Sequence, residues 1–237
     1  MPRVGPRRPL RAASIALPFA LLAGAAAASP IGAEGVRLAP ATPGAVRFTV
    51  TVPPPRLTRV DPEQRVDRLE LPGYVAESDP GTPAIPARTL LVAVPPLGEV
   101  RLTAVATELS VRDGVTLASN PGLDAQGHAV PMPRKLAAYG AAGTGTPAAA
   151  RLLGVTWMRN QRVARVAIAP VAYEPAARRL TVAGRVDVEL SVAPWGSWGP
   201  RAEAIDPFET VYRLALVNYE QGRAWRRPQA QIGRAHV

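Results

Sequence analysis

The chain contains no cysteine among its 237 residues. No disulfide can therefore brace the fold, and no thiol is available as a catalytic nucleophile. Histidine is nearly as scarce, with two residues. No combination of His, Asp and a nucleophile clusters as a stand-alone enzyme would require. The sequence also lacks a phosphate-binding loop and a metal-ligand cluster, so we expect no cofactor and no metal.

Lysine is almost absent, since Lys135 is the single lysine among 28 basic residues. The formal net charge of +10 comes from arginines that are scattered along the chain. A surface that stacks nucleic-acid bases needs basic residues clustered with aromatic ones. A GC-rich coding sequence accounts for the abundance of Ala, Gly, Pro and Arg, and we predict that the chain does not bind nucleic acid.

A long hydrophobic run occurs at the N-terminus, over residues 12–27. Four arginines precede it: Arg3, Arg7, Arg8 and Arg11. Such a run followed by small residues is typical of a secretory signal peptide, cleaved here between Ala28 and Ser29. A membrane-spanning helix is the alternative, but Pro18 interrupts the run and alanine is a weak anchor. We predict a signal peptide over residues 1–28, a secreted, extracellular mature chain, and no stable membrane anchor.

Apolar and polar residues alternate over residues 46–52, 100–107 and 186–192. This period of two is typical of half-buried antiparallel strands. We expect residues 161–173 and 179–192 to pair as one long hairpin. Because an isolated hairpin is only marginally stable, these apolar faces need an opposing sheet. The sequence therefore predicts an all-β fold, an antiparallel β-sandwich, over residues 29–194.

Prolines and glycines punctuate residues 71–96. Within them, Gly81-Thr82-Pro83-Ala84-Ile85-Pro86 leads into an apolar run at residues 88–94, which Pro95-Pro96 closes. Proline biases its predecessor toward extended geometry, so this pattern predicts an extended entry into a buried strand. Residues 119–150 are rich in Pro, Gly and Ala and predict a long loop. Loops of this length are often functional or disordered.

The alternating pattern stops after Pro194. Asp206-Pro207-Phe208-Glu209 is typical of a helix start, with Asp206 as the cap and Pro207 in the first position. Apolar residues then recur at helical spacing, so we predict a short helical C-terminal tail. Residues 231–237 (QIGRAHV) are similar to a translated sequencing adapter, and we predict that they are an artefact.

Three segments together resemble the N-terminal propeptide of gingipain-like cysteine peptidases. The first is Leu71-Pro72-Gly73-Tyr74 with the Gly81-to-Pro86 stretch and its strand. The second is residues 161–175 with the strand at 180–192. The third is Asn218-Tyr219-Glu220-Gln221 with Trp225-Arg226. The resemblance covers about residues 46–227, and the order and spacing of the segments carry it.

This resemblance implies that residues 29–194 are a β-sandwich prodomain, with residues 195–230 leading towards a catalytic domain absent from this fragment. In the family the prodomain gives latency and folding assistance to a caspase-like catalytic domain, its partner in cis. That domain uses a Cys–His pair, which cannot be placed here because cysteine is absent and His128 lies in the long loop as a solvated histidine. The fragment is therefore expected to have no peptidase activity.

The family resemblance also implies an inhibitory side chain that occupies the specificity pocket of the peptidase without productive cleavage. Arg134 and Lys135, in the long loop, are the candidates. An arginine can bond a carboxylate in such a pocket with two hydrogen bonds. A solvated loop arginine is the alternative for Arg134, given how many arginines the chain contains.

Arg226 and Arg227 form a possible maturation cleavage site, since exposed interdomain segments are readily cleaved. A charged helix end that complements the helix dipole is the alternative. For the whole chain, the alternative function is an extracellular β-sandwich adhesion or carbohydrate-binding module, in which Trp195 and Trp198 would stack on sugar rings.

Overall fold

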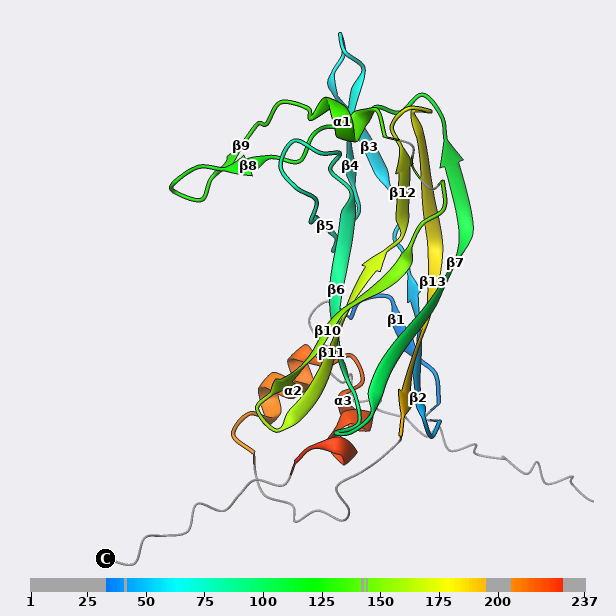
Figure 1. The fold of residues 1–237 in the computed structure, drawn as a ribbon, viewed down its shortest axis with the longest axis vertical. Helices are drawn as coiled ribbons and strands as arrows, with labels where there is room; N and C mark the ends of the chain where they lie inside the picture. The colour runs from blue at the N-terminus through cyan, green and yellow to red at the C-terminus, as the bar shows by residue number, and fades with distance from the viewer. Residues whose placement is uncertain (1–32, 41, 142, 144, 195–205, 228–237) are drawn as a thin grey trace, which may run out of the picture.

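Two antiparallel sheets pack face to face and form an elongated β-sandwich (Figure 1). The structure is a computed structural model that describes residues 33–40, 42–141, 143, 145–194 and 206–227. The predicted signal peptide with its Ala28–Ser29 cleavage site, Trp195 and Trp198, and residues 231–237 lie outside the described residues. The predicted all-β sandwich with a short helical C-terminal tail is confirmed.

The five-stranded sheet is built around one long strand. Its strands are β1 (Val36–Leu38), β2 (Ala45–Thr51), β7 (Glu99–Arg112), β12 (Val171–Glu174) and β13 (Arg179–Ala193). β13 pairs with β7 along one edge, and with β12 and then β2 along the other. β1 pairs with the far edge of β2.

The four-stranded sheet has the order β10-β11-β6-β5. Its strands are β5 (Val75–Ala76), β6 (Pro86–Ala93), β10 (Ala149–Met158) and β11 (Gln161–Ala169). The predicted extended entry into a buried strand is confirmed, because β6 begins at Pro86 and its residues Leu90 and Val92 are buried in the core.

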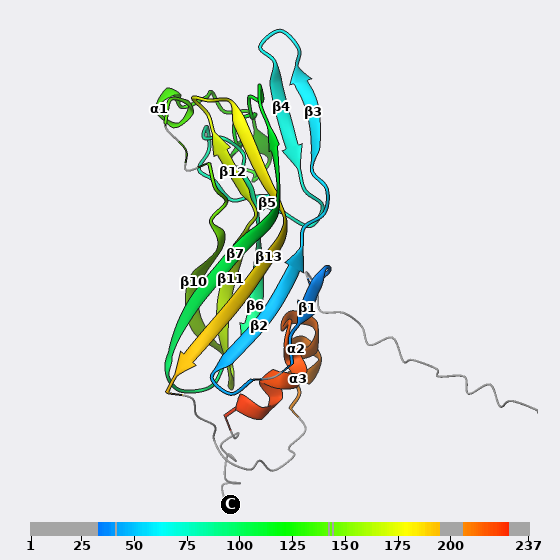
Figure 2. The ribbon, with the colours of Figure 1, turned by 90° about the vertical axis from the view of Figure 1, so that its right-hand side faces the viewer.

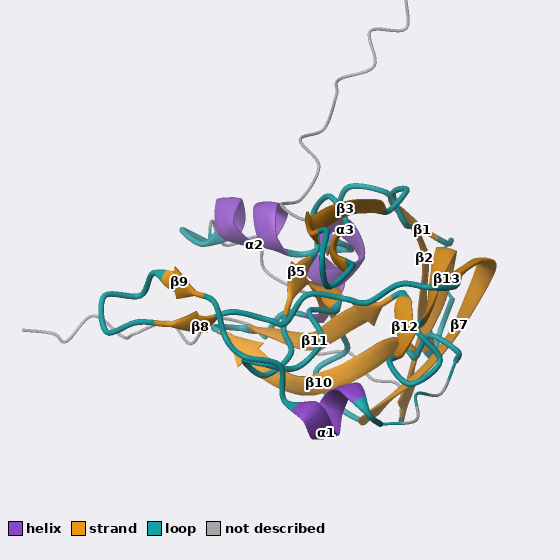
Figure 3. Ribbon diagram, turned by 90° about the horizontal axis from the view of Figure 1, so that it is seen from above, coloured by secondary structure: helices purple, strands orange, loops and turns teal. Residues whose placement is uncertain are grey.

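Two small hairpins extend beyond these sheets. β3 (Arg56–Asp61) and β4 (Val66–Glu70) form one, which projects past the end of the sandwich (Figure 2). β8 (Gly122–Leu123) and β9 (Ala129–Val130) form the other, which projects sideways and is followed by the one-turn helix α1 (Leu136–Tyr139). Figure 3 shows from above that the second hairpin lies beyond the four-stranded sheet, away from the five-stranded one.

The core lies between the two sheets, and the predicted alternation places residues in it correctly. Val46, Phe48 and Val50 of β2 are buried, whereas Arg47 between them is exposed and Thr49 is half-buried. The even-numbered residues from Val186 to Val192 in β13 are buried in the same way. Each such side chain contributes about 1.5–3 kcal/mol when it is fully buried, and this burial stabilises a fold that has no disulfide.

The predicted long hairpin between residues 161–173 and 179–192 is wrong. β11 pairs with β6 and β10 in the other sheet. Of residues 161–173, only those in β12 pair with β13. Pro170 separates β11 from β12, and proline has no N–H to donate to a strand partner. Its carbonyl instead accepts a hydrogen bond from the N–H of Ala183 at 2.9 Å. The chain therefore changes sheets at Pro170.

The C-terminal tail comprises α2 (Glu209–Ala215), α3 (Tyr219–Gly222) and the 3₁₀ turn η1 (Arg223–Trp225). The predicted cap at Asp206 is wrong: α2 begins at Glu209 with Phe208 as its N-cap and no side-chain cap. The Asp206 carboxylate instead accepts the Phe208 N–H at 2.9 Å, in the turn before the helix. Tyr212 and Leu216 are completely buried, so residues 206–227 share the core of the sandwich. The predicted division at residue 194 thus separates two segments that pack together. No helix within the described ranges is both long and apolar enough to cross a membrane.

Asn218 attaches the tail to the free edge of β6. Leu216 forms a parallel bridge with Leu91, and the N–H of Val217 donates to the Leu91 carbonyl. The buried Asn218 side chain then accepts the N–H of Ala93 at 2.7 Å and donates to the Ala93 carbonyl at 2.9 Å. A side-chain amide here does what the backbone of a neighbouring strand would do.

Replacing Asn218 with alanine should lower the free energy of unfolding by about 2–4 kcal/mol, because a buried N–H and C=O lose their partners at about 1–3 kcal/mol each. Urea denaturation measures this change. The control Gln126→Ala, at an exposed hairpin tip, should stay within about 0.5 kcal/mol of the wild type. Equal stability of the two variants would show that Asn218 does not secure the tail.

Candidate functional site

The predicted long loop leaves the sandwich after Ala118 and returns to it at β10. It contains the β8–β9 hairpin and α1, which occupy the same end of the molecule (Figure 1). The Ser119 hydroxyl donates to the Met132 carbonyl at 2.6 Å and so ties the start of the hairpin to its end. The hairpin is thus closed at its neck.

Gly81 fixes the base of this loop. Its N–H donates to the Asn120 carbonyl at 2.9 Å, and its own carbonyl accepts the Lys135 N–H at 2.8 Å. Gly81 has φ +82°, and an added Cβ would lie 2.8 Å from the Pro133 oxygen and 3.1 Å from Lys135 Cγ. Only glycine fits this conformation and this approach. The Pro/Gly segment therefore anchors both ends of the stretch from Asn120 to Lys135, which carries the hairpin, and it also leads into β6.

Arg134 and Lys135 lie where the loop returns to Gly81, and their side chains have different surroundings. The Arg134 guanidinium is 5.4 Å from the centre of the Tyr139 ring, and the residue is half-buried. The Tyr139 hydroxyl donates to the Leu117 carbonyl at 2.8 Å, and burial raises the pKa of Tyr139 to about 12. Tyr139 therefore provides a fixed, neutral surface under Arg134, whereas Lys135 is exposed.

The tip of the β8–β9 hairpin is organised by Asp124. Its carboxylate accepts the N–H groups of Gln126 and His128, at 2.9 and 2.8 Å, and lies 3.2 Å from the His128 ring. The His128 N–H, the strongest contact, helps to hold the pKa of Asp124 below its usual value. The His128 side chain is 78% exposed, as expected for a solvated loop histidine. The hairpin also exposes Leu123, with 74% of its surface accessible.

Arg226 and Arg227, the possible cleavage site, are both held against the fold. The Arg226 side chain is 6% exposed and forms an ion pair with Glu209. Its guanidinium lies 4.4 Å from the centre of the Tyr212 ring. The Arg227 N–H donates to the Asn160 carbonyl at 2.8 Å. Cleavage here stays a prediction, and it requires Arg226 to leave its pocket before a peptidase can bind the side chain.

Glu209 connects this cluster. Its carboxylate accepts hydrogen bonds from the Tyr219 hydroxyl and the Arg226 guanidinium, and Arg223 lies 3.7 Å away. Burial alone would raise the pKa of Glu209. The hydrogen bonds from Tyr219 and Arg226 outweigh it, so that the pKa lies below its usual value. An ionised carboxylate therefore links α2 to α3 and to Arg226 within the tail.

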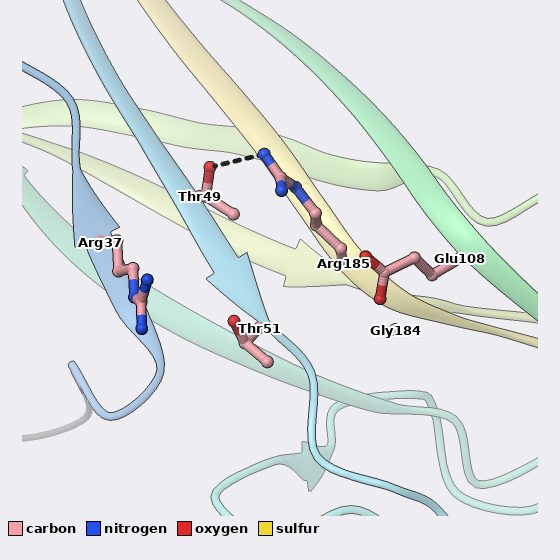
Figure 4. A pocket seen from close by; sticks show the side chains of 6 residues that line it. All are labelled: Arg37, Thr49, Thr51, Glu108, Gly184 and Arg185. Carbon is pink, nitrogen blue, oxygen red and sulfur yellow. Dashed lines mark hydrogen bonds between the residues drawn. The ribbon is translucent and has the colours of Figure 1, made fainter.

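A polar depression lies on the outer face of the five-stranded sheet (Figure 4). It is lined by Arg37, Thr49, Thr51, Glu108, Gly184 and Arg185. Arg185 and Thr49 both bond the Asp187 carboxylate, at 2.9 and 2.6 Å, so two of its polar side chains already have partners. Among the described residues, no group of three or more His, Asp or Glu side chains could hold a metal ion.

Sequence reasoning located the loop and the tail but missed the residues that fix them. Gly81 was assigned to the entry of β6, and Asn218 to a family segment without a role. The one available signal was the Pro80-Gly81 dipeptide, because proline directly beside glycine marks a tight turn. The contacts of both residues are made with segments far away in the sequence, which no local pattern specifies.

Comparison with known proteins was made at three levels. The C25 propeptide model (Propeptide_C25) matches residues 35–225. No curated protein matches the chain. Several solved chains share its fold, including those of two structures. The complex of the pro- and mature domains of RgpB from Porphyromonas gingivalis has a TM-score of 0.66 and 20% identity, covering 79% of this chain and 97% of that one. A structure on the zymogenic latency of gingipain K from Porphyromonas gingivalis has a TM-score of 0.52 and 22% identity, covering 66% and 90%.

Replacing Gly81 with alanine should release the long loop, since the new methyl group would displace Pro133 and Lys135. Limited proteolysis should cut the loop at least about tenfold faster than in the wild type, as expected when an anchored loop opens locally. Gly44→Ala is a matched control, because Gly44 also has positive φ but an added Cβ meets nothing within 4 Å. Equal cleavage rates in both variants would contradict the anchoring role.

Replacing Glu209 with glutamine should destabilise the protein by about 1–2 kcal/mol at pH 7, through loss of charge-assisted bonds. A carboxyl group whose folded pKa is lowered stabilises above its unfolded pKa, and this stability is lost as the pH falls through the folded pKa. The difference between variant and wild type should therefore shrink below about pH 4. Urea denaturation at pH 7 and pH 3.5 tests this. Glu220→Gln, in an exposed ion pair, should change little, and a pH-independent Glu209 effect would refute the assignment.

Proposed function

This chain belongs to the C25 propeptide family, and on that premise we propose that it keeps a caspase-like peptidase domain latent and assists its folding. It is a non-catalytic propeptide region of a gingipain-like cysteine peptidase. The partner is the catalytic domain in cis, an arrangement suggested by the RgpB structure, which contains pro- and mature domains in complex.

The observation that supports latency most directly is the anchored loop. Within it, Asn120 and Lys135 both bond to Gly81, and Ser119 closes the neck of the hairpin, so Arg134, Lys135 and the hairpin are presented in one arrangement. An inhibitor that is rigid before binding loses less conformational entropy when it binds. A preorganised loop of this kind suits a segment that fills an active-site cleft without being cleaved.

Arg134 and Lys135 are the side chains proposed to occupy the specificity pocket of the peptidase. The guanidinium of Arg134 can give two parallel hydrogen bonds to a pocket carboxylate. Its stacking on Tyr139 limits the directions it can take, and so reduces the entropy it loses on insertion. Lys135, one residue further on and exposed, is the second candidate.

Maturation and export complete the proposal. Cleavage at Arg226 or Arg227 would separate the prodomain from the catalytic domain, once the tail has released Arg226. The signal peptide over residues 1–28, cleaved between Ala28 and Ser29, would export the precursor, and the mature protein would be secreted. The alternative of an adhesion or carbohydrate-binding module is not favoured by the family match.

The first experiment is to sequence the genomic DNA downstream of the codon for Ala230. We expect a continuous reading frame that encodes a caspase-like domain with a Cys–His pair. The peptidase domain so recovered should then be inhibited in trans by the purified chain. A stop codon in that frame, or a well-folded chain that does not inhibit, would overturn the proposed function.

Replacing Arg134 with alanine should weaken this inhibition by about tenfold or more, since a charged hydrogen bond contributes about 1.5–3 kcal/mol. The inhibition constant with the downstream peptidase domain measures the effect, and Lys135→Ala is tested beside it. Arg37→Ala, an exposed arginine on the opposite sheet, serves as the matched control. Inhibition that is unchanged in the Arg134 variant would remove Arg134 from the site.

A further inference from the structure

The outer face of the four-stranded sheet is only partly covered. At its lower end the tail packs on it, where Gly222 lies against Ala93 so closely that an added Cβ would be 2.4 Å from the Ala93 Cβ. Further up, Thr89, Ala167 and Arg151 lie in one row across β6, β11 and β10. Directly paired residues of antiparallel strands point to the same face, so Arg151 points outward here. We call the surface of Thr89, Arg151 and Arg165 the docking face.

Arg165 lies on the same face as Arg151. It is two residues from Ala167 in β11, and side chains two residues apart on a strand share a face. Residues 164, 166 and 168, which alternate with it, are completely buried in the core. Both Arg151 and Arg165 are exposed, and neither forms a hydrogen bond or an ion pair within the described part of the chain. Thr89, the third residue of this face, donates a hydrogen bond to Glu77.

Several arginines of the five-stranded sheet form ion pairs. On the outer face of the five-stranded sheet, Arg47 pairs with Glu189 and Arg185 pairs with Asp187. Arg101 at its edge pairs with Glu99. These three arginines thus have acidic partners, whereas Arg151 and Arg165 have none within the described residues. A surface with unpaired charge of one sign favours a partner of opposite charge, through faster encounter and more specific docking.

Two projections border the docking face. The β8–β9 hairpin above and α2 below both lie on the side of the molecule that faces away from the five-stranded sheet (Figures 1 and 3). Each exposes apolar side chains: Leu123 of the hairpin at 74%, and Val211 of α2 at 42%. Exposed apolar groups next to a polar face are typical of protein–protein contacts.

The distances suit one globular partner. The eight residues of β6 span roughly 26 Å between the loop base and the tail, at about 3.3 Å per residue. A domain of about 250 residues has a radius of gyration of about 18 Å and is therefore about 45 Å across. A domain that begins after Arg227, beside the tail, can reach Arg134 by lying along this face.

We propose that the docking face is the surface on which the downstream peptidase domain lies, and that this domain opposes Arg151 and Arg165 with carboxylates. The inference rests on the proposed function and adds to it the face that is used and the charge of the partner surface. Inhibition then depends on two separate contacts: the loop that reaches the specificity pocket, and an electrostatic contact that orients the domain below it.

The test is the charge-reversed double variant Arg151→Glu/Arg165→Glu, measured with the downstream peptidase domain. The association rate should fall at least tenfold at low salt, and the salt dependence seen for the wild type should weaken, because rim charges act mainly on association. The double alanine variant should show a smaller decrease in the same direction. Arg37→Glu/Arg112→Glu, which reverses two exposed arginines of the opposite sheet, should associate within about threefold of the wild type. Thermal unfolding confirms that all variants remain folded.

The outcomes separate the two proposals. If the wild-type chain inhibits and the docking-face variant associates as fast as the control variant, the docking face is refuted while the proposed function stands. If the wild-type chain does not inhibit at all, the proposed function fails and this inference fails with it. A selective loss in the docking-face variant supports both.

Discussion

Pairing along β13 is the interaction on which the sandwich depends. Of the other strands in its sheet, β2, β7 and β12 bond to it directly, and β1 is attached through β2. The same strand contributes Val186, Val188 and Leu190 to the core. Since the chain has no cysteine, stability rests on this backbone pairing and on the burial of apolar side chains between the sheets.

The edge of β6 that faces away from β11 has no strand partner over much of its length, and the tail covers it. β5 covers only the first part of that edge, and residues beyond it would leave backbone groups without partners. Leu216, Val217 and the Asn218 amide cover the remainder. An uncovered strand edge invites pairing with other chains. The end of the prodomain is therefore part of its fold, and Arg226 is buried as a consequence.

These two features explain how a small sandwich can act as a propeptide. A rigid core supports a loop in which Asn120 and Lys135 are fixed at Gly81, while the tail packs at the other end of β6. The loop, the tail and the two unpaired arginines lie on one side of the molecule. Under the proposed function, latency depends on the relative positions of the loop, the tail and these arginines.

The sequence alone determined the strand faces, the helical tail and the long loop, because these follow from periodicity and from local backbone preferences of Pro and Gly. It also carried the family resemblance, and hence the fold class. Tertiary structure decided which strand β11 pairs with, that the tail packs on β6, and that Gly81 anchors the loop carrying Arg134 and Lys135. These depend on contacts between residues far apart in the sequence, such as Gly81 with Asn120 and Ala93 with Asn218. A local pattern determines which face of a strand is buried. The neighbouring strand with which it pairs depends on the packing of the whole chain.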